Sequence, residues 1–296
     1  MEIPRKTLDQ LTEEINAFSA AGKQMVLNAL TNAEWGDVSE LRAIMVDVME
    51  AVCGDMTDLA AARSAEFYDS VRTSAVGARL GAIADSAREP KATEGAVRAL
   101  IQSVESTGST DQFARELAGR VDYEIKRAAG ECTALNAARD PLKPRCARVP
   151  SGAETCKFCV MLASRGFVYL PKEHGGGSPH YHASCDCRIV PGFYGMDVEG
   201  YDTADLFQQY LDNLDAGFSP NTKSGKTRER RAKTWGSTKF ESYGAFADYA
   251  SSAKDVEDLQ RRCEIITDEW KKTTLSEQYW SRLRYVVMHK RAQLEA

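Results

Sequence analysis

The chain has 296 residues, of which 43% are hydrophobic and 27% are charged, and its formal net charge at pH 7 is -5. This composition excludes collagen-like, low-complexity and fully disordered proteins, and the length suffices for about two domains. No stretch approaches the roughly 18 uninterrupted apolar residues that span a bilayer, and the first residues lack a signal-peptide core. We therefore expect a cytoplasmic protein without membrane association, and one that does not coat nucleic acid over its whole surface.

Five amphipathic helices are predicted before residue 140. In each, apolar residues recur at steps of three and four, which is the spacing of one buried helix face. Gly54 is expected to bend or break the second helix, and the third is expected to stop before Pro90. No internal repeat of fixed period is found, which argues against a solenoid. The predicted ranges are 7–32, 39–59, 73–88, 92–106 and about 110–140.

The residue pattern changes between Arg145 and Phe193, where short β-prone segments alternate with glycine and proline. Beyond this region we expect a short helix at 203–214, a basic stretch at 219–239 and helical structure again in about the last 50 residues. The predicted fold class is α+β and predominantly α-helical. The predicted domains are a helical domain at 1–140, a small α+β module at 141–195, and a basic linker with a helical C-terminal region at 196–296.

Eight cysteines are present, and four of them form two close pairs between residues 156 and 187. Paired cysteines beside histidines in a reducing cytoplasm favour metal binding over disulfide formation, because their thiolates stay available as ligands. The remaining four are scattered singly and are expected to be small buried hydrophobic residues. These four are Cys53, Cys132, Cys146 and Cys263.

The paired cysteines and two histidines supply six donors for a metal site. A C-x-x-C pair on a tight turn directs two sulfurs at one ion, and donors from the far end of a loop complete a tetrahedron. Thiolate and imidazole favour zinc over magnesium or calcium, and a shell made only of protein donors indicates a closed structural site. Such an ion would make the small module depend on metal for folding. The donors are Cys156, Cys159, His180, His182, Cys185 and Cys187.

Four of these six donors suffice for one zinc ion. In an extended segment the two histidines share one face, and so do the last two cysteines, so that only one of each pair need face the metal. The alternative is a set of reduced core cysteines with surface histidines. We predict the ligands Cys156, Cys159, His182 and Cys185, with Cys187 as the first substitute and His180 as the second.

The order of motifs around these donors carries a family resemblance. A long helix is followed by Arg148-Val149-Pro150, Cys156-x-x-Cys159, Met161-Leu162-Ala163-Ser164-Arg165-Gly166, Val168-Tyr169, and finally His182-x-x-Cys185-x-Cys187 with Val190-Pro191. This string resembles the Mu-F-like minor head proteins of tailed bacteriophages, particularly those of actinobacteria. The family commonly closes with His-Pro-Asn-Cys-Arg-Cys, whereas this chain has His182-Ala183-Ser184-Cys185-Asp186-Cys187, so the donors match and the spacers differ.

The resemblance covers about 50 residues well and the preceding helices in general character, but not the region after residue 195. It implies a structural virion protein rather than an enzyme. Proteins of this family are low-copy components near the portal vertex, and they associate with the portal and major capsid proteins during head assembly. The implied location is the capsid interior or portal vertex of the virion, after assembly in the host cytoplasm.

The basic stretch after residue 219 is a candidate contact for packaged DNA. Glu229 is its only acidic residue, and attraction to phosphate requires no reading of base sequence. Trp235, Phe240 and Tyr243 lie nearby and are able to stack on bases. The alternative is a solvated linker. The candidate DNA contacts are Lys223, Lys226, Arg228, Arg230, Arg231 and Lys233.

Three enzymatic interpretations are weaker. The segment around Lys226 lacks the first glycine of a Walker A loop, because Pro220 stands at that position. The glutamate motif of a zinc deaminase is absent. A His-Asn-His-type nuclease, with His180 or His174 presented to DNA by a cysteine-braced loop, is the strongest enzymatic rival, but no downstream Asn-x-x-x-His accompanies the cysteines. The favoured prediction is a minor capsid protein with a structural zinc site and no catalytic residues; the alternative is a zinc-braced DNA-binding protein or nuclease.

Overall fold

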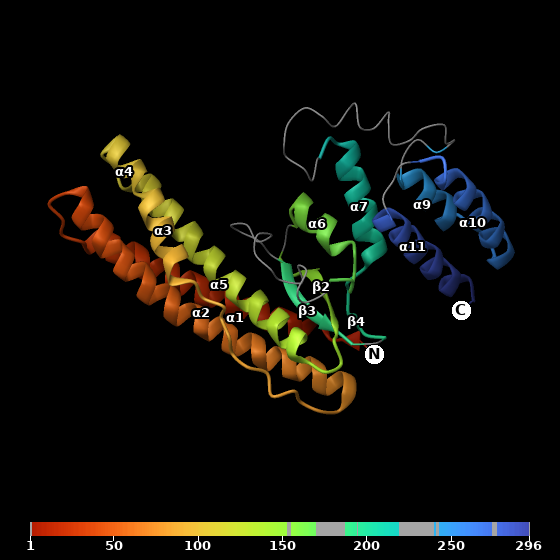
Figure 1. The fold of residues 1–296 in the computed structure, drawn as a ribbon, viewed down its shortest axis with the longest axis horizontal. Helices are drawn as coiled ribbons and strands as arrows, with labels where there is room; N and C mark the ends of the chain where they lie inside the picture. Colours follow the sequence, from red (N-terminus) through yellow and green to blue (C-terminus); the bar gives the residue numbers. More distant parts are fainter. Residues whose placement is uncertain are drawn as a thin grey trace. The chain divides into compact units, whose positions relative to one another are not determined.

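The computed structural model describes residues 2–152, 155–169, 187–193, 195–218, 240, 243–273 and 277–295. The chain divides into two compact units, Met1–Asp202 and Thr203–Ala296. The predicted predominance of helix is confirmed (Figure 1). The first unit holds β1 (Glu2–Ile3), α1 (Arg5–Asn32), α2 (Val38–Val76), α3 (Pro90–Leu100), α4 (Gln102–Thr107), α5 (Asp111–Arg139), β2 (Arg145–Pro150), α6 (Lys157–Ala163), β3 (Cys187–Gly192) and β4 (Asp197–Val198). The second holds α7 (Thr203–Asp215), α9 (Tyr243–Ser251), α10 (Val256–Trp270) and α11 (Glu277–Glu295).

The three long helices α1, α2 and α5 pack along one another and form the core of the first unit, here called the bundle (Figure 1). Their apolar stripes supply side chains that are fully buried, as the periodicity predicts. Gly22 allows close approach, because a Cβ there would lie 3.0 Å from Val121 Cγ1 and 3.2 Å from Met56 Cγ. The largest fully buried apolar side chains of the bundle are Tyr68, Phe113, Leu8, Ile15, Leu41, Met45, Met49, Leu117 and Ile125.

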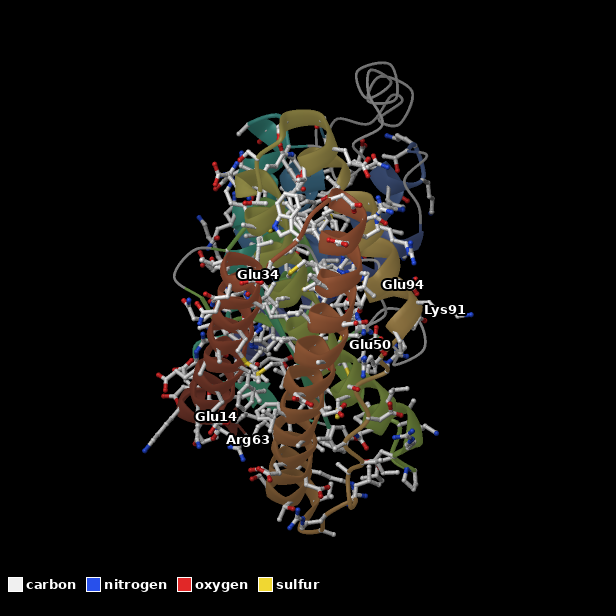
Figure 2. All side chains as sticks on the ribbon, turned by 90° about the vertical axis from the view of Figure 1, so that its left-hand side faces the viewer. Glu14, Glu34, Glu50, Arg63, Lys91 and Glu94 are labelled. Carbon is white, nitrogen blue, oxygen red and sulfur yellow. The ribbon has the colours of Figure 1, made fainter. Side chains whose placement is uncertain are left out.

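An ion pair on the solvent side joins the first two helices. Arg63 of α2 donates to both carboxylate oxygens of Glu14 on α1, at 2.7 and 2.8 Å. Figure 2 shows the two side chains next to each other between these helices. The hydrogen bonds from Arg63 lower the pKa of Glu14. Because both side chains are about one-third exposed, the pair contributes little stability and mainly orients one helix against the other.

Two predictions about α2 are wrong. The helix runs without interruption through Gly54, and it ends at Val76 with Gly77 in the left-handed region at φ 75°. A Cβ at Gly54 would lie 2.8 Å from Arg88 Nη1, so this glycine leaves room for a guanidinium rather than for a bend. The helix predicted at 73–88 is absent beyond Val76, and residues 77–89, here called the strap, are not helical.

The strap lacks a helix because polar side chains of the bundle bind its backbone. The carboxylate of Asp69, on α2, accepts the N–H groups of Leu80 at 2.9 Å, and of Gly81 and Ala82 at 3.1 Å. The side-chain amide of Asn136, on α5, accepts from Ile83 N at 2.8 Å and donates to Ile83 O at 2.9 Å. These bonds satisfy backbone groups that a helix would otherwise pair internally, so extended backbone costs little here.

Two short strand pairs complete the first unit. Strands β2 and β3 are antiparallel, with register from Arg145↔Gly192 to Pro150↔Cys187, and β1 pairs in parallel with β4. Strands β2 and β3 both pack on α5, and α6 packs on β2. We call β2, β3 and α6 the module. The predicted strand positions at 145–149 and 188–190 are confirmed, and this unit contains both the bundle and the module.

The second unit is held by aromatic side chains. The ring of Trp270 lies 5.4 Å from that of Phe246 and 5.1 Å from that of Trp280. Arg262 of α10 donates to Tyr249 O of α9 at 2.7 Å, which ties the two helices together. It also pairs with Asp258 of its own helix at 2.9 Å. The helix predicted at 203–214 is confirmed as α7. Among the described helices of both units, none has the length and apolarity needed to cross a membrane.

Candidate metal centre

The C-x-x-C pair lies at the start of α6. Cys156 is the N-cap residue, with an extended backbone at φ -64° and ψ 152°, and its Sγ accepts the backbone N–H of Cys159 at 3.3 Å. The Cys156 residue is exposed and Cys159 is buried. An N–H group aimed at a sulfur stabilises negative charge on it, and a thiolate is the form that binds a metal. The local fold therefore suits this pair for metal binding.

A third predicted donor, Cys187, begins β3. It is buried and lies opposite Pro150, the last residue of β2. Pro150 and Cys187 form a non-hydrogen-bonded pair of the ladder, because Cys146, four residues earlier on β2, exchanges its N–H and C=O with Tyr169 and not with β3. The backbone of Pro150 therefore faces away from β3.

The remaining predicted donors, His180, His182 and Cys185, lie outside the described residues. Within the described ranges, no group of three or more histidine, cysteine, aspartate or glutamate side chains is placed to hold a metal ion. The three described cysteines therefore do not make a site by themselves. A four-ligand site that uses the C-x-x-C pair would need donors from outside the described residues.

The scattered cysteines behave as predicted in three of four positions. Cys53, Cys132 and Cys146 are buried, whereas Cys263 is half-buried. Burial raises the pKa of the Cys53 and Cys146 thiols to about 12, so both stay protonated at neutral pH. Cys53, Cys132 and Cys146 are therefore part of the hydrophobic core.

Two residues of α1 that the sequence did not single out contact the ends of the strand pair. Arg5 donates from Nη2 to Pro150 O at 2.9 Å, and Asn16 accepts from Arg188 Nη2 on its Oδ1 at 3.0 Å. Arg188 directly follows the candidate ligand Cys187. These contacts span 145 and 172 residues, so no local sequence pattern signals them.

The predicted DNA contacts all lie outside the described residues. This applies to the whole basic segment at 219–239. His289, on α11, is described and exposed. The six predicted basic residues are Lys223, Lys226, Arg228, Arg230, Arg231 and Lys233.

Comparisons with known proteins find relatives that are phage proteins. The family described as VG15 protein matches residues 2–213, which include the bundle, the module and most of α7. The Gene 15 protein of Mycobacterium phage D29 is 34% identical over 115 residues, covering 28% of this chain and 41% of the relative. The Gene 15 protein of Mycobacterium phage L5 is 30% identical over 124 residues, covering 30% of this chain and 42% of the relative. No solved structure matches.

The chain thus spans about two fifths of the length of these curated relatives. The predicted origin in phages of actinobacteria is confirmed, because both relatives are mycobacteriophage proteins. The narrower resemblance to Mu-F-like minor head proteins is not addressed by these matches and stays a prediction.

Proposed function

Because the chain belongs to the VG15 protein family, we propose that it is a structural minor capsid protein of a tailed phage, which acts in head assembly at the portal vertex. The observation that carries this proposal is the match over residues 2–213 together with the mycobacteriophage origin of the relatives. The ordered motifs of the module add the resemblance to minor head proteins. The proposed partners are the portal and major capsid proteins of the same phage, and the proposed location is the virion. The proposed role requires no catalysis.

The bundle supports a mechanical role. Its longest helix, α2, has 39 residues, which corresponds to about 58 Å at 1.5 Å per residue. A helix of this length, buried along one face by α1 and α5, forms a stiff support. Such an element suits a protein that bridges larger components of an assembly.

The structural role is tested in the encoding phage. A nonsense mutation in the gene is expected to abolish DNA-filled heads, while the major capsid protein continues to accumulate. Mass spectrometry of wild-type virions is expected to find the protein at low copy number relative to the major capsid protein. Normal, infectious, DNA-filled heads from the mutant, or absence of the protein from virions, would reject the proposal.

We further propose that the module holds one structural zinc ion through Cys156, Cys159, His182 and Cys185. Thiolate and imidazole donors fit zinc, and the N–H bond to Cys156 Sγ fits a metal-bound thiolate at the start of α6. Cys187 and His180 stay as substitutes. Bound zinc would join the chain after β2 to the chain before β3, and would supply no chemistry beyond this clip.

Metal analysis tests this site. Protein purified without added zinc is expected to contain about one zinc per chain by atomic emission, and C156S is expected to lose most of it because a ligand is removed. The matched control is C263S, whose thiol is half-buried in the second unit and whose pKa is raised by burial. Less than about half an equivalent in the wild-type protein, or equal zinc in both variants, would reject the zinc site.

The basic segment is the basis of a second proposed contact, with packaged DNA. Lysine and arginine side chains between residues 223 and 233 are accompanied by a single acidic residue, Glu229. We expect binding to double-stranded DNA that weakens steeply with salt, because counterions are released when phosphates are neutralised. Neutral substitutions at Arg228, Arg230 and Arg231 are expected to remove most of it. Plasmid cleavage that is lost in H180A would instead support the nuclease alternative.

A further inference from the structure

We infer that the chain associates with further copies of itself through two surfaces of opposite charge on the first unit. The basic patch of one copy contacts the acidic stripe of the next. This inference goes beyond the proposed function and does not depend on the zinc site. The acidic stripe consists of Asp47, Ala51, Asp55, Asp58 and Leu59 on α2. The basic patch consists of Leu142, Lys143, Arg145, Arg165 and Val168 at the edge of the module.

The acidic stripe runs along the solvent side of α2. Its members recur at steps of three and four residues, which places them on one face of the helix over about three turns. All five residues are exposed, and the apolar side chain of Leu59 is 45% exposed among the carboxylates. Asp58 accepts a hydrogen bond from Ser86 Oγ at 2.9 Å. None of the three carboxylates forms an ion pair with a described residue, so their negative charge is available to a partner.

Two segments of the chain form the basic patch. Cys146 exchanges backbone hydrogen bonds with Tyr169, at 2.8 and 3.0 Å, which joins the two segments. Arg145 also donates from Nη1 to Val168 O at 2.9 Å. The apolar side chains of the patch are accessible, since Leu142 is 53% exposed and Val168 is 47% exposed. The basic side chains of the patch, none of which forms an ion pair with a described residue, are Lys143, Arg145 and Arg165.

Each surface has the composition of a small protein interface. Exposed apolar side chains lie among charges of a single sign, as the apolar centre and polar rim of an interface do. Because the two signs are opposite, the stripe of one copy attracts the patch of another, whereas two stripes or two patches repel each other. Nucleic acid would fit the basic patch alone, since the carboxylates of the stripe repel phosphate. A second copy of the chain fits both surfaces.

The two surfaces are too far apart to contact each other within one chain. The basic patch begins at the level of Arg72, near the end of α2, because Arg72 Nε and Leu142 N both donate to Asp140, at 2.7 and 2.9 Å. Asp55 precedes Arg72 by 17 residues, which is about 25 Å along a helix at 1.5 Å per residue. A contact between different surfaces continues from copy to copy, and it closes into a ring only if the rotation between neighbours permits it.

The test is sedimentation velocity of the purified full chain over a range of protein concentrations, at low and high salt. The surfaces are small, so we expect weak association that is lost as salt rises, because exposed charges are screened. D47K/D55K and K143E/R145E are each expected to weaken association at least about tenfold, because like charges then face each other. The control is E13K/E34K, which changes the net charge as D47K/D55K does, at two exposed glutamates outside both surfaces.

A mixture of the two charge-reversed variants distinguishes a lost contact from a folding defect. The reversed stripe of D47K/D55K then meets the reversed patch of K143E/R145E, so association is expected to return to within about threefold of the wild type. A wild-type protein that is monomeric under every condition, an equal loss in E13K/E34K, or a mixture that stays monomeric overturns the inference. DNA binding that is lost in K143E/R145E, in a protein without self-association, would assign the basic patch to nucleic acid instead.

Discussion

The bundle and the module belong to the same compact unit but are stabilised in different ways. The bundle consists of helices of 28, 39 and 29 residues whose apolar stripes face one another. The module consists of two six-residue strands and a seven-residue helix. Elements so short bury too little apolar area to be stable alone, since even a complete two-stranded hairpin is marginal in water. The module therefore depends on contacts from outside its own strands, and the bundle does not.

The docking of the module onto the bundle shows what those contacts are. Tyr68 of α2 packs edge-on against Phe193, with ring centroids 6.3 Å apart, directly after β3. Phe167 covers Gly192, where an added Cβ would lie 2.1 Å from the ring. These contacts and those of Arg5 and Asn16 hold one side of the strand pair, and we propose that zinc holds the end that carries the cysteines. Burial of long apolar stripes maintains the bundle, whereas the module combines a few buried strand residues with contacts from outside, to which the proposed zinc ion would add a cross-link.

The largest expected effect tests whether buried side chains stabilise the bundle. F113A removes a fully buried ring of α5 from the bundle. We expect a loss of about 3–5 kcal/mol in the free energy of unfolding, because transfer and cavity terms add. Urea denaturation followed by circular dichroism measures it. L142A, at a side chain that is 53% exposed, is expected to change stability by less than about 0.5 kcal/mol. A loss below about 1 kcal/mol in F113A would contradict the assigned role of the bundle core.

Removal of zinc tests whether a metal cross-link stabilises the module. At free zinc one hundredfold above the dissociation constant, binding stabilises the folded state by about 2.7 kcal/mol, which a chelator would remove. We expect backbone amides of β2 and β3 to exchange with deuterium faster after chelation, while those of α2 and α5 are unchanged. Hydrogen-exchange mass spectrometry measures both regions in one sample. Equal acceleration in the bundle would show that metal does not distinguish the two regions.

The next expected effect concerns the polar contacts that hold the strap on the bundle. In D69N an amide nitrogen replaces one of the two carboxylate oxygens. This nitrogen cannot accept the hydrogen bonds that the backbone N–H groups of the strap donate to that oxygen. A hydrogen bond to a charged group contributes about 1.5–3 kcal/mol, so we expect a loss of about 2 kcal/mol in urea denaturation. Burial alone would raise the pKa of Asp69, but hydrogen bonds from Ala82 and Leu80 outweigh it and lower the pKa.

The sign of the pH dependence follows from that direction. A folded-state pKa below the ordinary value of about 3.9 means that Asp69 stabilises the protein above that pH and stops doing so as the pH falls through the folded-state pKa. The difference in stability between the wild-type protein and D69N should therefore shrink below about pH 4. A difference that is constant from pH 7 to pH 3 would show that the carboxylate charge does not hold the strap.

The strap also shows which part of the fold could not be predicted from the sequence. The helices α1 and α5 and the first half of α2 were predicted because a stripe of apolar residues signals its own burial. The helix predicted at 73–88 fails because the partners of the strap backbone are Asp69 and Asn136, and the latter is 53 residues away from Ile83. The local spacing of apolar residues gives no information about hydrogen-bond partners that lie far away in the sequence.

The candidate site was likewise predictable only in part. Its donors are predicted from residue type and spacing, since few side chains bind zinc and they must recur at close intervals. The contacts that position the strand ends were not identified, because Arg5 and Asn16 are ordinary polar residues on the exposed side of a helical pattern. Their role depends on which distant segment packs against α1, and that is set by the tertiary fold.

The smallest expected effect lies in the strap and isolates backbone strain from side-chain contacts. Ala87 has φ 47°, in the left-handed region, where its Cβ is crowded, and its carbonyl accepts Arg127 Nη1 at 3.1 Å. A87G removes that crowding but gives the unfolded chain more freedom, so we expect a net gain of about 0.5 kcal/mol. A84G, at a neighbouring strap alanine without positive φ, has only the entropic cost and is expected to lose about 0.5–1 kcal/mol. Opposite signs in the two variants, measured by thermal denaturation, would show that the bundle forces the strap into a strained path; losses of equal size would show that Ala87 carries no strain.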